Sequence, residues 1–312
     1  MDRSPLTFRE NIYRSYRRMR FLLRRGTLFT LPGQNVDVDA TTKIFPKFTF
    51  RIILLNSLAI YLLSYFVVYF MTLLVTAISA SAFDISTVIF YYNIDYLIRG
   101  NEWTSDAVSA VFASGPLFSI FFAVLLFILY FNVASETGLL RLAVLWAFCH
   151  LVINFFGNML VGSIMNEGFG YVIMYMFVMD TGKMIITLFA FISLFLIGLL
   201  TTRLFLFSAN SYFNVLNKYN RMKFILSQFL APFLLGNIII FLFKLPEIRL
   251  FDILLNACTL LIILPVIFRS ITIQDMFFDE DPRKIKLAGY FILVTVLVMI
   301  TFRVGLTIGL RI

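Results

Sequence analysis

Long apolar stretches dominate the pattern of hydrophobic and polar positions along the chain. Seven such stretches carry very few charges and are long enough for an α-helix to cross the hydrocarbon core of a bilayer, which takes about 17–25 residues. They lie near 52–79, 116–134, 142–163, 184–206, 224–243, 250–268 and 287–310. The pattern predicts an all-α polytopic transmembrane helix bundle of about seven spans, with a basic tail at 1–51 and a transmembrane domain at 52–312.

Two further apolar stretches are too short to cross. Thr87–Ile98 holds Tyr91, Tyr92 and Tyr96, and Phe169–Met179 follows the third predicted span. Both fall in connections that we expect on the outer side. Because aromatic residues favour membrane interfaces, we interpret both stretches as surface-lying helices at the outer interface. The alternative is a re-entrant piece that dips into the bundle.

Composition supports the membrane class. Hydrophobic residues make up 61% of the chain and charged residues 14%, whereas soluble domains average roughly 45–50% and about 25%. The two cysteines, Cys149 and Cys258, fall inside apolar runs, so they offer neither a disulfide framework nor a zinc site. The sequence has no phosphate-binding glycine loop and no repeated Cys and His spacing. We therefore expect no cofactor and no resident metal.

The distribution of charge predicts an orientation. The formal net charge of +9 follows from 26 basic and 17 acidic residues. Basic residues resist translocation and remain on the cytoplasmic side of a membrane. With the N-terminus inside, the seven spans place 20 of the 26 basic residues inside and 6 outside. We therefore expect a cytoplasmic N-terminus and an external C-terminus, in the cytoplasmic membrane if the protein is bacterial.

The basic tail has the pattern of an amphipathic helix over about 5–25, between a Ser-Pro start and a Gly stop. One face is apolar, with Phe8, Ile12, Tyr16, Met19 and Leu23. Arginines occupy much of the remaining surface, at Arg9, Arg14, Arg17, Arg18, Arg20, Arg24 and Arg25. We expect this helix to bind anionic lipid headgroups, although the arginines also suffice as a topology signal. No base-reading module accompanies them, so nucleic acid is not an expected partner.

The third predicted span carries the clearest polar pattern. His150, Asn154 and Asn158 follow at steps of four, which places them on one stripe of a helix. Asn237 and Asn256 fall at a similar depth in two later spans. Because polar groups in hydrocarbon must face protein or water, the pattern predicts a polar layer between helices. Three interpretations are open: interhelical hydrogen bonds, a solvated path for a substrate or ion, or a metal site, for which one histidine offers few ligands.

Catalysis finds little support in the residue types. The chain has one histidine, whereas an intramembrane zinc protease needs two at His-Glu-x-x-His spacing, and a serine nucleophile needs a base with an oriented acid. We therefore expect a non-enzymatic multi-span membrane protein, either a subunit of a membrane assembly with partner subunits or a permease for a small solute or lipid. The alternatives are an intramembrane enzyme that uses His150 as acid or base on a lipid-like substrate, and a scaffold or regulator whose basic tail binds lipid.

Two predictions concern the last span. Arg303 lies roughly 24 Å from the cytoplasmic end of that span at 1.5 Å per residue, which is close to the depth of Asp252 at the outer end of the sixth span. We expect these two residues to form an ion pair. Gly305 and Gly309 form a G-x-x-x-G pair, which predicts close packing of the last span against another helix.

Overall fold

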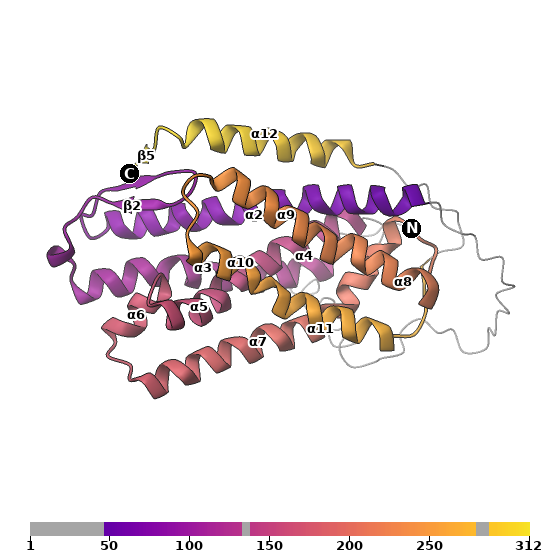
Figure 1. Cartoon of the computed structure of the whole chain (residues 1–312), viewed down its shortest axis with the longest axis horizontal. Coiled ribbons are helices and arrows are strands. Elements are labelled where there is room, and N and C mark those ends of the chain that lie inside the picture. The colour runs from indigo at the N-terminus through magenta and orange to yellow at the C-terminus, as the bar shows by residue number, and fades with distance from the viewer. Residues whose placement is uncertain (1–46, 133–137, 279–286) are drawn as a thin grey trace, which may run out of the picture.

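A computed structural model describes residues 47–132, 138–278 and 287–312 of the chain. The predicted amphipathic helix and its seven arginines lie outside these residues, so headgroup binding by the tail stays a prediction. The described chain is an elongated bundle of helices, with a small hairpin at one end (Figure 1).

Within the described residues, six helical rods are long and apolar enough to cross a membrane. Three rods are single helices, α2 (Lys47–Ser81), α3 (Ser105–Asn132) and α7 (Asp180–Phe207). Three rods join two helices each: α4 (Gly138–Val152) with α5 (Asn158–Met165), α8 (Lys218–Ile225) with α9 (Ala231–Lys244), and α10 (Leu250–Ala257) with α11 (Thr259–Thr272). These rods confirm the all-α transmembrane helix bundle that the hydrophobic pattern predicts.

The last predicted span is a shorter apolar helix, α12 (Gly289–Gly305), of 17 residues. It lies along α2 and runs in the same direction (Figure 1). At its start, the Ala288 N–H donates to Asn56 Oδ1 at 2.8 Å, and beyond its end Leu306 joins the buried cluster that contains Ala77 of α2. The stretch of α2 between these contacts is about 30 Å long at 1.5 Å per residue, which matches the hydrocarbon core of a bilayer.

Helix α2 is the centre of the bundle, where it packs against α3, α4, α9 and α12. Its side chains Tyr61 and Phe66 are fully buried. On the other side of the bundle α7 packs against α11, with a very close approach at Gly198. A Cβ atom at that position would lie 2.5 Å from the Ile262 carbonyl oxygen, so only glycine allows this contact between the two helices.

The stretch Thr87–Ile98 does not form the expected surface helix. It is a β-hairpin of β1 (Thr87–Ile89) and β2 (Ile94–Tyr96), and β1 also pairs antiparallel with β5 (Leu310–Arg311). The physical reasons are the strand preference of β-branched and aromatic residues, a 2.7 Å backbone hydrogen bond that closes the turn, and the long-range pairing of β1 with β5. The pairing with β5 places the end of the chain beside this hairpin, opposite the start of α2 (Figure 1).

The second short stretch is helical as expected, in α6 (Phe169–Tyr175), which packs against α3 and α5. The predicted G-x-x-x-G contact, in contrast, is wrong. A Cβ atom at Gly305 would meet nothing within 4 Å, and Gly309 lies beyond the end of α12 with a φ of +85°. Gly309 thus lies in the turn that leads into β5, not on a helix surface. The turn requires a left-handed backbone at this position, which glycine adopts readily.

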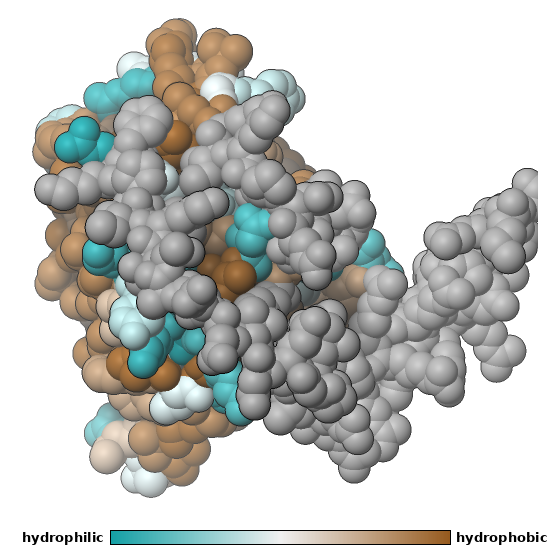
Figure 2. Space-filling model, turned by 90° about the vertical axis from the view of Figure 1, so that its right-hand side faces the viewer, coloured by the Kyte–Doolittle hydropathy of each residue, from teal (hydrophilic) through white to brown (hydrophobic). Residues whose placement is uncertain are grey.

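Polar and apolar surfaces separate as a membrane requires. Figure 2 looks onto the end of the bundle at which α2 begins, where hydrophilic residues gather between strongly hydrophobic flanks. Along the sides, large apolar residues such as Phe121, Met184 and Leu188 are more than half exposed. Exposure of this extent along whole helices is what lipid contact predicts. At this same end, β3 (Val215–Leu216) and β4 (Met276–Phe277) form a short antiparallel pair.

Candidate functional site

A cavity of about 380 Å³ lies inside the half of the bundle that carries the hairpin. Its walls come from α2, α3, the α4 and α5 rod, the end of α9, and α10. Tyr65 and His150 line its deepest part and stand near the midpoints of their rods. At the other extreme, Tyr96 of β2 and Glu167 of the turn before α6 line its mouth. The cavity therefore reaches from the end of the bundle to its middle.

The deepest wall is aromatic and contains the histidine. His150 Nε2 lies 3.2 Å from the backbone oxygen of Tyr61. A carbonyl can only accept, so Nε2 carries a proton and donates. The rings of Tyr61, Tyr65 and Trp146 surround the imidazole, with centroids 4.7, 5.5 and 6.3 Å away. The hydrogen bond to the Tyr61 oxygen fixes the orientation of the ring and leaves Nδ1 as its acceptor nitrogen.

Asparagines occupy the middle of the cavity wall. Asn154 Nδ2 donates to Thr72 Oγ1 of α2 at 2.9 Å and to Ser119 Oγ of α3 at 2.7 Å. Asn158 Nδ2 in turn donates to Asn154 Oδ1 at 2.9 Å. Asn154 belongs to a π-helical turn, Ile153–Gly157, between α4 and α5. Such turns are rare and frequently occur at functional sites, and here the turn holds one amide between two neighbouring helices.

The outer wall holds three charged residues, which we call the charged corner: Lys244, Arg249 and Asp252. Lys244 is 1% exposed, and its Nζ lies 3.3 Å from Asp252 Oδ2 and 4.3 Å from the centre of the Tyr69 ring. Arg249 Nη2 lies 3.5 Å from Asp252 Oδ1. All four residues line the cavity. A single buried carboxylate therefore lies between two cations.

The mouth of the cavity is aromatic. A second hollow of about 640 Å³ adjoins it, and the two share Tyr96, Phe112 and Tyr171 on their walls. The rings of Phe112 and Tyr171 are 4.9 Å apart, and Trp103 packs on Tyr96 at 5.3 Å. Burial raises the pKa of Tyr96 above its ordinary value, so its hydroxyl stays neutral. The approach to the cavity thus combines apolar surface with uncharged polar groups.

No protein-family model, curated protein or solved structure matches the chain. Function is therefore inferred from the cavity itself. Among the described residues, no group of three or more His, Cys, Asp or Glu could hold a metal ion.

Four of the five residues of the predicted polar layer lie together on the cavity wall: His150, Asn154, Asn158 and Asn256. Asn237 does not line the cavity. Its Nδ2 donates to the Phe233 oxygen of its own helix at 2.9 Å, and its amide faces Tyr61. The layer thus extends along the wall formed by α5 and α10, and it does not include α9 at the depth of Asn237.

The predicted pair of Asp252 and Arg303 is not formed. Asp252 pairs with Lys244 and Arg249 instead. Arg303 donates to the backbone oxygens of Phe243 at 2.6 Å and Leu245 at 3.1 Å. The physical reason is that α9 ends beside α12, and the last carbonyls of a helix have no partner within it. The guanidinium of Arg303 supplies those partners.

Sequence reasoning missed the charged corner. The pattern of apolar and polar positions does not single out Lys244 or Arg249, which are two of the six basic residues expected on the outer side. The signal that identifies them is the short connection between α9 and α10, since residues 245–249 alone separate the two helices. A connection of this length makes consecutive helices antiparallel neighbours, so a cation at the end of one helix and Asp252 in the first turn of the next must meet.

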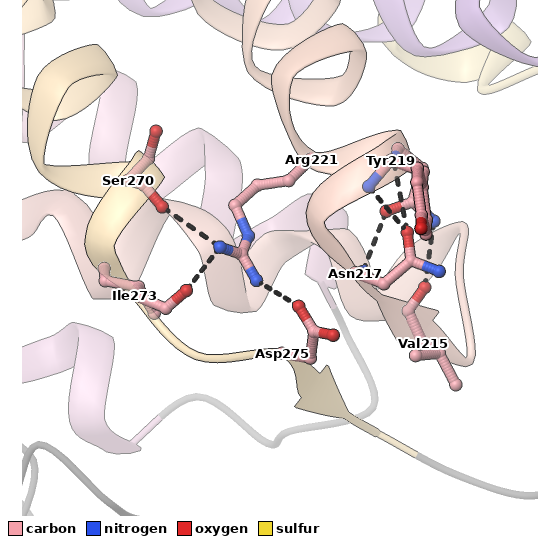
Figure 3. Close-up of polar contacts among 8 residues, drawn as sticks. Val215, Asn217, Tyr219, Arg221, Ser270, Ile273 and Asp275 are labelled. Carbon is pink, nitrogen blue, oxygen red and sulfur yellow. Dashed lines mark hydrogen bonds and ion pairs between the residues drawn. The ribbon is translucent and has the colours of Figure 1, made fainter. Parts of the chain in front are cut away.

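A contrasting buried cation belongs to α8, which lies at the opposite end of the bundle (Figure 1), and Figure 3 shows its contacts. Arg221 of α8 donates through Nη1 to the backbone oxygens of Ser270, at 3.3 Å, and of Ile273, and through Nη2 to Asp275 Oδ1 at 2.6 Å. These contacts join α8 to the end of α11. None of these four residues lines the cavity.

Proposed function

We propose that this multi-span membrane protein binds a small polar solute in the cavity and carries it across the membrane. The observation that carries the proposal is the cavity itself, which reaches from the end of the bundle to its middle with His150, three asparagines and the charged corner on its walls. A volume of about 380 Å³ is within the range for sites that enclose small ligands. Solute sites of transporters commonly lie near the bilayer midplane.

Polar packing alone accounts less well for these residues. Interhelical hydrogen bonds that only hold a bundle join side chains which fill the space between helices. In this bundle the imidazole, the amides and the charged corner surround an open volume. Ionisable groups inside a membrane are costly and mark substrate or ion pathways. A buried Lys244 on a cavity wall fits a pathway better than a packed interface.

The other half of the bundle closes the path. Beyond His150, Trp146 Nε1 donates to Ser57 Oγ at 3.1 Å, and Ser57 Oγ donates to the Gln228 backbone oxygen at 2.6 Å. The Gln228 side chain donates to Ser208. Phe205 and Phe229 pack on Trp146 around this group. A cavity that is accessible from one end and sealed by packed residues at the other corresponds to one of the two states that alternating access requires.

The excess of basic residues at the sealed end supports an orientation. The start of α2, with Arg51, and helix α8, with Lys218 and Lys223, lie at that end. By the positive-inside rule this end faces the cytoplasm. We therefore propose that the cavity opens to the outside and that the solute is taken up from there.

Uptake into proteoliposomes tests the proposal. We expect the full-length chain to accelerate entry of one class among radiolabelled organic acids, amino acids, sugars and polyamines, relative to protein-free liposomes. Asn154→Leu and Asn158→Leu should each reduce that uptake at least about tenfold, because each leaves a buried polar partner unpaired at the site. Asn237→Leu, which lies off the cavity wall, is the matched control and should retain uptake.

Two results would contradict the proposal. One is that no class of solute enters faster than in protein-free liposomes. The other is that both cavity variants, eluting as folded protein on gel filtration, transport as well as Asn237→Leu.

A further inference from the structure

We infer that the solute carries a carboxylate or a phosphate group, and that Lys244 and Arg249 bind this group within the cavity. The inference deepens the proposed function and rests on it. The outer wall of the cavity has the composition of an anion site, and its present contacts leave that site incompletely satisfied.

The first observation is the charge of the corner. Lys244 and Arg249 contribute two positive charges and Asp252 contributes one negative charge, so the corner carries a net charge of +1. Glu167, the other acid on the cavity wall, forms no ion pair among the described residues and stands at the mouth. A net positive corner whose Lys244 and Asp252 are buried attracts an anionic group more strongly than an isolated surface cation does, because the low dielectric around these two residues strengthens the field.

The second observation is the length of the contacts. Asp252 lies 3.3 Å from Lys244 Nζ and 3.5 Å from Arg249 Nη2, whereas charge-assisted hydrogen bonds are about 2.7–2.9 Å long. Asp252 Oδ2 is buried without a hydrogen bond among the described residues. The carboxylate therefore holds the two cations in place without saturating them. Both retain N–H donors that a ligand oxygen can accept.

The third observation is the burial of Lys244. Its ammonium has three donors, yet within the described residues its contacts are one carboxylate oxygen and the face of the Tyr69 ring. A buried cation is costly unless it is well paired. A lysine that is 1% exposed, lines a cavity and keeps free donors is explained by a ligand that completes its coordination.

The amides indicate what the rest of the solute carries. The side-chain N–H groups of Asn154, Asn158 and Asn256 all donate within the protein. An amide oxygen can accept two hydrogen bonds, so the oxygens of these side chains, including Asn154 Oδ1 that already accepts from Asn158 Nδ2, are the groups that can still accept from a solute. A solute that fits both walls has an anionic group at the charged corner and hydroxyl or ammonium donors toward the asparagines. Small hydroxy acids, amino acids and hydroxylated phosphate esters share this chemistry.

Thermal unfolding of the purified full-length chain tests the inference. The probes are glycolate, which carries a carboxylate, and glycerol 3-phosphate, which carries a phosphate. Glycerol, which lacks the phosphate, and choline, which is a cation, are the controls. Each is used at millimolar concentration and constant ionic strength. We expect at least one anion to raise Tm, because a ligand that binds only the folded state stabilises it. The anion that does so identifies the group, and glycerol and choline should leave Tm unchanged.

Matched variants locate the effect. Arg249→Gln should raise the Kd of the effective anion at least about tenfold, which corresponds to the loss of one charge-assisted hydrogen bond. Its side chain is partly exposed, so the variant should fold. Arg99→Gln removes an exposed cation of the same outer region that does not line the cavity, and it should keep the wild-type Kd.

The possible failures are distinguishable. Unchanged Tm with both anions, or an equal Kd in Arg249→Gln and Arg99→Gln, overturns the inference. If the uptake assay then shows a neutral or cationic solute whose entry depends on Asn154, the proposed function stands and only the anion assignment fails. Absence of uptake for every class contradicts the proposed function itself.

Discussion

Two buried cations at opposite ends of the bundle differ in what surrounds them. Arg221, 5% exposed, directs both terminal nitrogens at oxygen atoms of α11 and of the segment that follows it. Lys244, 1% exposed, has one carboxylate at 3.3 Å and an aromatic ring, and the cavity lies beside it. Both terminal nitrogens of Arg221 thus bind oxygen atoms of the fold, whereas the ammonium of Lys244 has one acceptor, at 3.3 Å, among the described residues.

The difference in surroundings indicates that Arg221 has a structural role and that Lys244 is available for ligand binding. A buried guanidinium with three oxygen acceptors stabilises the contact between the segments it joins, because both the charge and the carbonyls are paired. A buried ammonium with free donors next to an open volume is available to a ligand. We therefore expect variants at Arg221 to change stability alone, and variants at Lys244 to change ligand binding as well as stability.

The largest expected effect is at the sealed end. Arg221→Ala removes the donor to the Ser270 and Ile273 carbonyls and the charge partner of Asp275, and should lower the free energy of unfolding by about 3 kcal/mol. Denaturant unfolding in detergent measures this loss. Asp275→Asn is the matched control: it keeps the two carbonyl contacts and, since Asp275 is 45% exposed, should cost no more than about 1 kcal/mol. Equal losses in the two variants would show that the carbonyl contacts contribute nothing.

The next effect concerns the charged corner. Lys244→Met leaves Asp252 buried with only the longer Arg249 contact, and should destabilise the chain by about 2 kcal/mol. Adding Asp252→Asn should restore roughly half of that loss, because the unpaired charge is removed. Unfolding of the single and double variants measures the coupling. Strictly additive losses would mean that the pair of Lys244 and Asp252 does not form.

A smaller effect is expected at the end of α9. Arg303→Gln removes two donors to backbone carbonyls and should cost about 1–2 kcal/mol. Combined with Asp252→Asn, the losses should add within about 0.5 kcal/mol, since the structure places no contact between the two residues. A coupling well above that value would restore the ion pair that the sequence predicts.

Sequence reasoning succeeded where a signal is periodic. Apolar length predicts the rods, and the four-residue spacing of His150, Asn154 and Asn158 predicts that they share a wall, since helix geometry alone fixes both. The π-helical turn at Ile153–Gly157 keeps all three residues on that wall.

The features that the sequence does not predict depend on contacts between segments that are far apart in the chain or meet only through its turns. The hairpin depends on pairing of β1 with β5, whose partner lies at the far end of the chain. Arg303 binds the backbone carbonyls at the end of α9 and not the carboxylate of Asp252. Lys244 lies beside Asp252 because the short connection at 245–249 brings α10 next to the end of α9.

In the proposed function, the cavity wall at Asn154 faces water that is continuous with the outside. Labelling of Asn154→Cys with a membrane-impermeant maleimide tests it most directly, in intact cells and in a background with Cys149→Ala and Cys258→Ala. Ala190→Cys, fully buried on α7 and away from the cavity, is the control. We expect rapid labelling of the cysteine at position 154 from the outside and no labelling of the cysteine at position 190. Equal protection of both positions in folded protein would contradict it.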